Sequence, residues 1–117
     1  MSEWKTRITK VQVVKPAKES GEACLVLIYP PGPDMGKRFP LSRSEVVLGR
    51  GGDCDVQVDR DSVSRRHARV FRNGDQWMVE DLGSTNGTFH NGNRLQGSRP
   101  LQPGDRIQVG TTVIEAQ

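Results

Sequence analysis

Three short polar clusters along the chain contain the residue types that bind anions. They are Gly49-Arg50, Ser64-Arg65-Arg66-His67 and Ser84-Thr85-Asn86-Gly87. An arginine guanidinium offers a planar fork of N–H groups to two oxygens of a phosphate or carboxylate. Hydroxyl and carboxamide groups add further donors and acceptors. Together the clusters predict a site that holds a phosphate dianion.

Two of these residues have ordinary structural interpretations when each is taken alone. Arg50 follows a glycine at the end of an apolar run, where an arginine is commonly just solvated. Ser64 follows an Asp-rich connection, where a serine hydroxyl can donate to an oxyanion or cap the local backbone. The evidence therefore lies in their combination with the third cluster.

The third cluster belongs to a longer loop sequence, DLGSTNGT, at residues 81–88. Two glycines flank three small hydrogen-bonding residues, so this loop can fold tightly and direct backbone and side-chain groups outward. The carboxamide of Asn86 is both a donor and an acceptor, which suits a peptide backbone better than a bare charge. The loop therefore indicates a peptide ligand.

The segments between the clusters have the composition of short β-strands. Apolar and β-branched runs are separated by Asn-Gly and Pro-Gly turns, and no helical apolar stripe persists over 11 residues. Strands are expected at residues 23–29, 37–41, 46–49, 56–58, 68–72, 76–81, 88–90, 106–109 and 112–115. This pattern predicts an all-β fold: a twisted antiparallel β-sandwich of about 10 to 11 short strands, with the binding loops at one end.

The length of 117 residues fits one domain. Residues 1–22 mix charged residues with valines and end in a Pro, Ser and Gly stretch, so we expect an N-terminal tail or linker there. The VQVV run at residues 11–14 is an alternative edge strand. The domain itself is expected over residues 23–117.

Charge and cysteine content exclude several function classes. Five of the 17 basic and two of the 14 acidic residues lie within residues 1–20, so the rest of the chain carries twelve of each. A neutral body argues against nucleic-acid binding. Cys24 and Cys54 lack a C-x-x-C spacing, and His67 and His90 have no matching ligand cluster, so no metal and no cofactor are expected. No apolar run of about 18 residues or secretory h-region is present, which favours a cytoplasmic protein without membrane contact.

Taken in order, the GR, SxxH and NG motifs with DLGSTNGTFHNG resemble the forkhead-associated (FHA) domain. The resemblance covers roughly residues 23–115 and implies a fold of the SMAD/FHA type. FHA domains are β-sandwiches that bind phosphothreonine peptides. The resemblance implies that Arg50 and Ser64 contact the phosphate and that Arg65 adds positive charge. Thr85 would help hold the phosphothreonine, and Asn86 would bond the peptide main chain beyond it.

The resemblance also implies supporting roles. His67 would brace the binding loops, and Gly49 and Gly87 would meet geometric requirements. Candidates for reading the ligand beyond the phosphothreonine are Ser62, Arg66 and Asn91.

These observations predict a monomeric, non-catalytic signalling module whose partner is a phosphothreonine-containing protein, such as a Ser/Thr kinase or its substrate. The alternative within the same fold is phosphate-independent docking. An enzyme with Ser64 as nucleophile and His67 as base is not expected, because the sequence places no orienting carboxylate and no obvious oxyanion hole beside them. Thr6 and Thr9 in the basic tail raise a separate hypothesis, in which the domain binds its own phosphorylated N-terminal segment.

Overall fold

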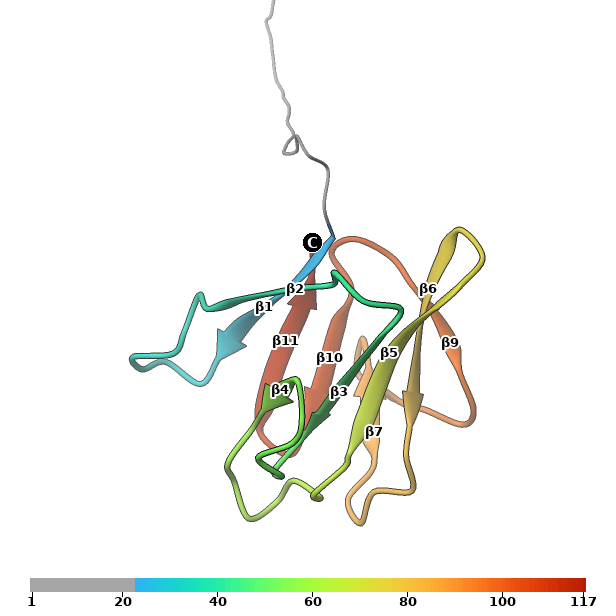
Figure 1. The fold of residues 1–117 in the computed structure, drawn as a ribbon. Helices are drawn as coiled ribbons and strands as arrows, with labels where there is room; N and C mark the ends of the chain where they lie inside the picture. Colours follow the sequence, from blue (N-terminus) through green and yellow to red (C-terminus); the bar gives the residue numbers. More distant parts are fainter. Residues whose placement is uncertain (1–22) are drawn as a thin grey trace, which may run out of the picture.

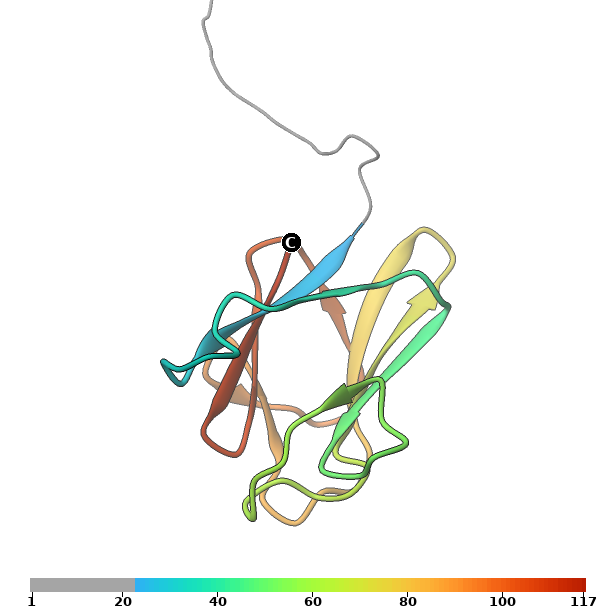
Figure 2. The ribbon, with the colours of Figure 1, turned by 60° about the vertical axis from the view of Figure 1, so that its left-hand side comes forward.

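The computed structural model describes residues 23–117, which form two β-sheets packed face to face (Figure 1). The six-stranded sheet has the order β2-β1-β11-β10-β7-β8, and the five-stranded sheet has the order β4-β3-β5-β6-β9. A view turned by 60° shows the two layers side by side (Figure 2). The strands are β1 (Cys24–Tyr29), β2 (Arg38–Pro40), β3 (Glu45–Gly49), β4 (Val56–Gln57), β5 (Ala68–Asn73), β6 (Gln76–Asp81), β7 (Thr88–His90), β8 (Asn93–Arg94), β9 (Arg99–Leu101), β10 (Arg106–Val109) and β11 (Thr112–Ala116).

Alternating side chains build the core between the sheets. In β5, Ala68 and Val70 are fully buried, while Arg69 on the opposite face bonds Glu80 and Glu45, each at 2.7 Å. This period-2 alternation is what a sheet with one buried face requires. The remaining core consists mainly of leucine, isoleucine and valine side chains from both sheets.

Strand register brings four connections to one end of the sandwich. Leu48 of β3 lies opposite Ala68 of β5, and Ala68 lies opposite Asp81 of β6. In the other sheet, Val109 of β10 lies opposite Thr88 of β7. The β3–β4, β4–β5, β6–β7 and β10–β11 connections therefore share the lower end in Figure 1.

The all-β sandwich is confirmed, and the nine strands expected from the sequence are present with bounds within one residue at each end. Two strands were missed. β8 has only two residues, both polar and exposed, and β9 contains Pro100, so neither shows an apolar alternation. The purely antiparallel expectation needs one correction, because β3 pairs with β4 in parallel.

The residues 23–117 contain no helix long and apolar enough to cross a membrane. The predicted tail, the alternative edge strand at residues 11–14 and the threonines Thr6 and Thr9 lie outside the described residues.

Packing of β11 generates a stability prediction. Ile114 is fully buried, opposite Leu27 of β1 and Ile107 of β10, whereas its neighbour Val113 is half-buried. Ile114→Ala leaves a cavity between the sheets and should lower the free energy of unfolding by about 2 to 5 kcal/mol. Urea denaturation measures this loss, and Val113→Ala is the control. Equal losses in the two variants would contradict the packing described.

Candidate functional site

The first polar cluster is joined to the second by main-chain hydrogen bonds. The Arg50 amide donates to the Ser64 carbonyl at 2.9 Å, and the Gly51 amide donates to the Arg65 carbonyl at 3.0 Å. A Cβ atom at Gly49 would lie 2.2 Å from the Arg65 carbonyl oxygen, so only glycine fits there. The end of β3 and the loop before β5 are thereby held side by side.

The Arg50 side chain is exposed but anchored along one edge. Its Nε donates to the Val63 carbonyl at 3.0 Å. No other hydrogen bond or ion pair from this guanidinium to any of residues 23–117 is present. The two terminal nitrogens are therefore free to donate, and the fork is oriented before any ligand arrives.

His67 joins the second cluster to the third from inside the protein. Its side chain is fully buried, its Nδ1 accepts from the Ser64 amide at 3.0 Å, and its Nε2 lies 2.8 Å from the Gly87 carbonyl. A backbone N–H can only donate, so Nδ1 is unprotonated and Nε2 carries the proton. A neutral imidazole thus bridges the two loops.

The third cluster is also tied directly to the second. The Thr85 amide donates to Ser64 Oγ at 3.1 Å, and Asn86 Nδ2 donates to the Ser62 carbonyl at 2.9 Å. Ser62 is tightly packed as well against the β10–β11 turn, where a Cβ at Gly110 would lie 2.3 Å from the Ser62 Oγ. All four connections at this end of the sandwich therefore support one another.

Asp81, at the end of β6, organises the third cluster, a role that the residue pattern alone did not assign. Its carboxylate accepts from the Gly83 and Ser84 amides at 2.9 and 3.0 Å, and from the Ser84 and Thr88 hydroxyls at 2.5 and 2.6 Å. Burial of Asp81 opposes ionisation, but these four hydrogen bonds outweigh it and hold its pKa below the usual value. The sequence could have indicated this role, because Asp81 precedes Gly83 and Ser84 by two and three residues, a spacing typical of a turn capped by an aspartate side chain.

Gly87 closes the third cluster with a left-handed backbone. Its φ is 85°, a conformation that other residues rarely adopt, and its amide donates to Ser84 Oγ at 2.8 Å. Its carbonyl faces His67. The tight loop that the two glycines predicted is therefore present.

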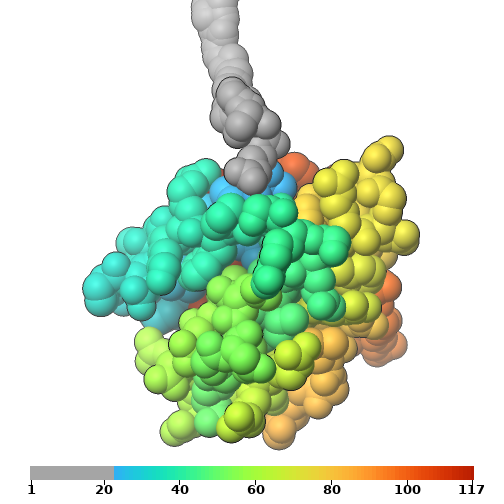
Figure 3. All heavy atoms as spheres, viewed as in Figure 1, coloured from blue at the N-terminus to red at the C-terminus, as the bar shows by residue number. Residues whose placement is uncertain are grey.

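The structure brings all but one of the predicted site residues to the same end. Arg65 and Arg66 are exposed there, and an Arg66 nitrogen lies 3.8 Å from a carboxylate oxygen of Asp53. Residues 50–67 and 82–87 form adjoining surface at the lower end of the space-filling view (Figure 3).

Asn91 lies at the other end of β7, away from these loops. Its φ is 50°, its Oδ1 accepts from the Arg106 amide at 2.8 Å, and its Nδ2 donates to Asp105 at 3.1 Å. Both polar atoms of its carboxamide are thus engaged in a turn. Asn91 is therefore not proposed as a residue that reads the ligand.

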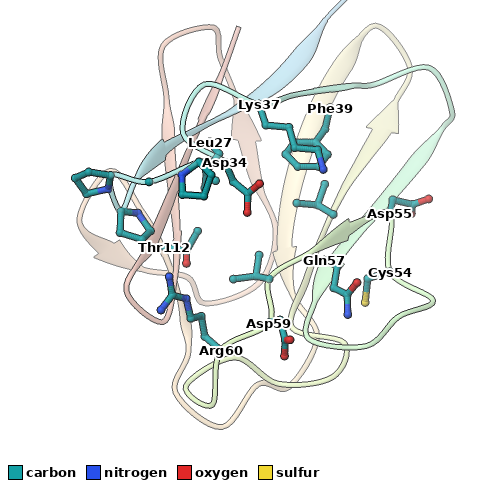
Figure 4. Close-up of a pocket in the computed structure, with 16 residues that line it drawn as sticks. Leu27, Asp34, Lys37, Phe39, Cys54, Asp55, Gln57, Asp59, Arg60 and Thr112 are labelled. Carbon is teal, nitrogen blue, oxygen red and sulfur yellow. The ribbon is translucent and has the colours of Figure 1, made fainter.

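A separate groove of about 640 Å³ lies between the β1–β2 connection and the β4 region. Figure 4 shows Leu27 and Thr112 on the left of this groove, with Gln57 on the right and Asp59 below. None of the predicted phosphate-contacting residues lines it. The candidate site is therefore an exposed loop surface rather than this hollow.

Comparison with known proteins gives the same family as the clusters. A family model for the FHA domain matches residues 46–110, which span all three clusters. The chain belongs to the FHA-domain family. The oxoglutarate dehydrogenase inhibitor of Corynebacterium jeikeium is 44% identical over 89 residues, covering 76% of this chain and 61% of that protein. The chain thus spans less than two thirds of the length of this relative.

Solved FHA structures superpose on the same region. Mycobacterium tuberculosis EmbR in complex with a low-affinity phosphopeptide has a TM-score of 0.75 and 29% identity, covering 82% of this chain and 24% of that one. A structure solved for phosphothreonine-dependent FHA domain interactions has a TM-score of 0.72 and 29% identity, covering 83% and 96%. The chain therefore shares its fold with FHA domains whose structures were solved for phosphothreonine-dependent interactions.

Asp81 generates a pH prediction. Asp81→Asn replaces an acceptor of four bonds with a group that can donate, so we expect a loss of about 1 to 3 kcal/mol in the free energy of unfolding at neutral pH. Because the folded-state pKa is lowered, the ionised carboxylate stabilises the fold above its unfolded pKa, and this contribution disappears as the pH falls through the folded pKa. The difference between wild type and variant should therefore narrow below about pH 4.

Chemical denaturation at a series of pH values measures this narrowing. Wild type and variant should share the acid sensitivity that comes from Asp105, where burial opposes ionisation but hydrogen bonds from Gln102 and His90 lower the pKa. A stability difference independent of pH would show that the Asp81 charge does not support the loop.

Proposed function

We propose that this FHA domain binds phosphothreonine segments of partner proteins through the loops at one end of its sandwich. Arg50, Ser64, Arg65 and Thr85 would hold the phosphothreonine, and Asn86 would bond the peptide main chain. The observation that carries the proposal is the Arg50 guanidinium next to Ser64, anchored by Nε and with terminal nitrogens that bond to none of residues 23–117.

Donor geometry around Ser64 supports a phosphate ligand. Ser64 Oγ already accepts from the Thr85 amide, so its single O–H remains available to donate to an anion. A phosphate brings about −1.5 to −2 charge, and each hydrogen bond to a charged group contributes about 1.5 to 3 kcal/mol. Donors from Arg50 and Ser64 are therefore enough to separate a phosphorylated peptide from the bare one.

Asn86 retains an unused acceptor and an unused donor proton for a contact with a peptide main chain. Its Nδ2 uses one proton on the Ser62 carbonyl, which fixes the orientation of the exposed carboxamide. Its Oδ1 can accept a peptide N–H, and the second Nδ2 proton can reach a peptide carbonyl. The side chain therefore suits an extended ligand that lies across the loop.

The arrangement of Ser64 and His67 supports binding without catalysis. Nδ1 of His67 accepts from the Ser64 backbone amide, and Nε2 lies against the Gly87 carbonyl, so neither nitrogen is bonded to the Ser64 hydroxyl. A serine nucleophile needs its base on the hydroxyl and an orienting group behind that base. Both imidazole nitrogens here are occupied by backbone.

A phosphothreonine ligand also defines the kind of partner. The phosphate must be installed by a Ser/Thr kinase, so the proposed partner is such a kinase or one of its substrates. Because these kinases use cytoplasmic ATP, we propose a cytoplasmic location for the domain.

Removal of the Arg50 guanidinium tests the proposal. Arg50→Ala should abolish detectable binding of a phosphothreonine peptide, because the oriented fork is lost. Titration calorimetry against a phosphothreonine peptide library measures this, with unphosphorylated peptides as the ligand control and Arg106→Ala, at the opposite end of the sandwich, as the protein control. The thermal unfolding midpoint shows whether the fold is retained.

Two outcomes would contradict the proposal. Unchanged affinity in Arg50→Ala would remove this residue from the site. Equal binding of the phosphorylated and bare peptides by the wild-type domain would favour phosphate-independent docking.

A further inference from the structure

Arg94 does not belong to the three clusters, but its side chain lies against Gly87 in the third cluster. It is exposed on the edge strand β8, directly opposite Phe89 of β7. A Cβ atom at Gly87 would lie 2.8, 2.9 and 3.1 Å from its Nε, Cζ and Nη2. Three nearly equal distances mean that the flat face of the guanidinium covers Gly87.

This placement gives Gly87 a second reason to be glycine. Its positive φ already disfavours side chains, and any Cβ would displace the Arg94 guanidinium as well. The arginine is thus positioned by a close approach to the main chain of the loop. Its N–H groups, which lie in the guanidinium plane, point along the surface rather than into the loop.

Among residues 23–117, Arg94, like Arg50, has no carboxylate partner, whereas several other arginines do. Arg43, Arg69 and Arg106 pair with Asp55, Glu80 and Glu115 respectively. Over the described part of the chain, the Arg94 guanidinium forms neither an ion pair nor a hydrogen bond. A full positive charge with unused donors therefore stands at the edge of the site.

The Arg94 guanidinium lies near the path expected for the peptide beyond the phosphothreonine. Gly87 follows Asn86, the proposed main-chain contact beyond the phosphothreonine, and consecutive Cα atoms are only about 3.8 Å apart. A peptide that leaves Asn86 across the outer side of the loop passes the Arg94 guanidinium. The phosphate is held by the Arg50 and Ser64 side of the site, so Arg94 is left for a different group.

We propose that Arg94 is a specificity-determining residue that binds an acidic side chain on the C-terminal side of the phosphothreonine. The inference rests on the proposed function, because it assumes a phosphopeptide bound through Arg50 and Asn86. A guanidinium with free coplanar N–H groups matches the two oxygens of an aspartate or glutamate. Solvent exposure keeps the gain modest, so the contact selects among phosphopeptides rather than creating affinity by itself.

Paired peptides test this assignment. A phosphothreonine peptide with one glutamate moved stepwise through the positions after the phosphothreonine is compared with a series carrying glutamine at the same positions. For wild type, we expect one position at which glutamate binds about threefold to fivefold tighter than glutamine. In Arg94→Gln this preference should disappear, so that the glutamate and glutamine peptides bind with equal affinity.

Arg106→Gln is the matched control, since Arg106 is another exposed arginine on the outer face of the same sheet but at the far end. It should retain the glutamate preference. Arg94→Glu should reverse the preference and favour lysine at the selected position. The reversal separates a charge contact from simple packing of Arg94 against Gly87.

The results distinguish this inference from the proposed function. If phosphopeptides bind and Arg50→Ala abolishes binding, but glutamate and glutamine peptides remain equivalent at every position, the Arg94 assignment is overturned and the phosphate site stands. A preference that survives in Arg94→Gln would also overturn it. If no phosphopeptide binds at all, the proposed function fails first.

Discussion

The binding end of this FHA domain depends on one buried neutral imidazole. His67 accepts from the Ser64 amide and donates to the Gly87 carbonyl, so the second and third clusters are held at a fixed separation. Both partners are backbone groups, and the imidazole itself is fully buried, where an unpaired polar atom is costly. Protonation of Nδ1 would set two donors against each other. The separation of the second and third clusters therefore depends on these two hydrogen bonds.

Much of the fold and site could be predicted, because the decisive features are local. Alternation of apolar residues locates strands such as 76–81, and glycine-flanked polar runs locate the loops. The joint order of the three clusters then carries the family resemblance. Features that arise from tertiary contact could not be predicted in the same way, because they join residues that no short spacing connects. The parallel pairing of β3 with β4 and the position of Arg94 over Gly87 are of this kind.

Asn91 and Asp81 show the limits of reading polar residues by type. Asn91 stands in an Asn-Gly pair after a short strand and has a carboxamide like that of Asn86, yet its polar atoms bond Asp105 and Arg106 at the opposite end. Asp81 has no role in the clusters by residue type, yet it holds the third loop through four hydrogen bonds. The strand register decides at which end of the sandwich each of these side chains lies.

The cross-bonded loops also have a kinetic consequence. Because Arg50, Ser64 and Asn86 are already oriented by bonds to the protein, encounter with a ligand requires little rearrangement of the domain, and the entropic cost of ordering falls on the peptide. An exposed loop surface adds little apolar burial to slow dissociation. The phosphopeptide would dissociate often, and its phosphate would then be accessible to phosphatases. The lifetime of the phosphorylated state would therefore be set by the kinase and the phosphatase rather than by binding to this domain.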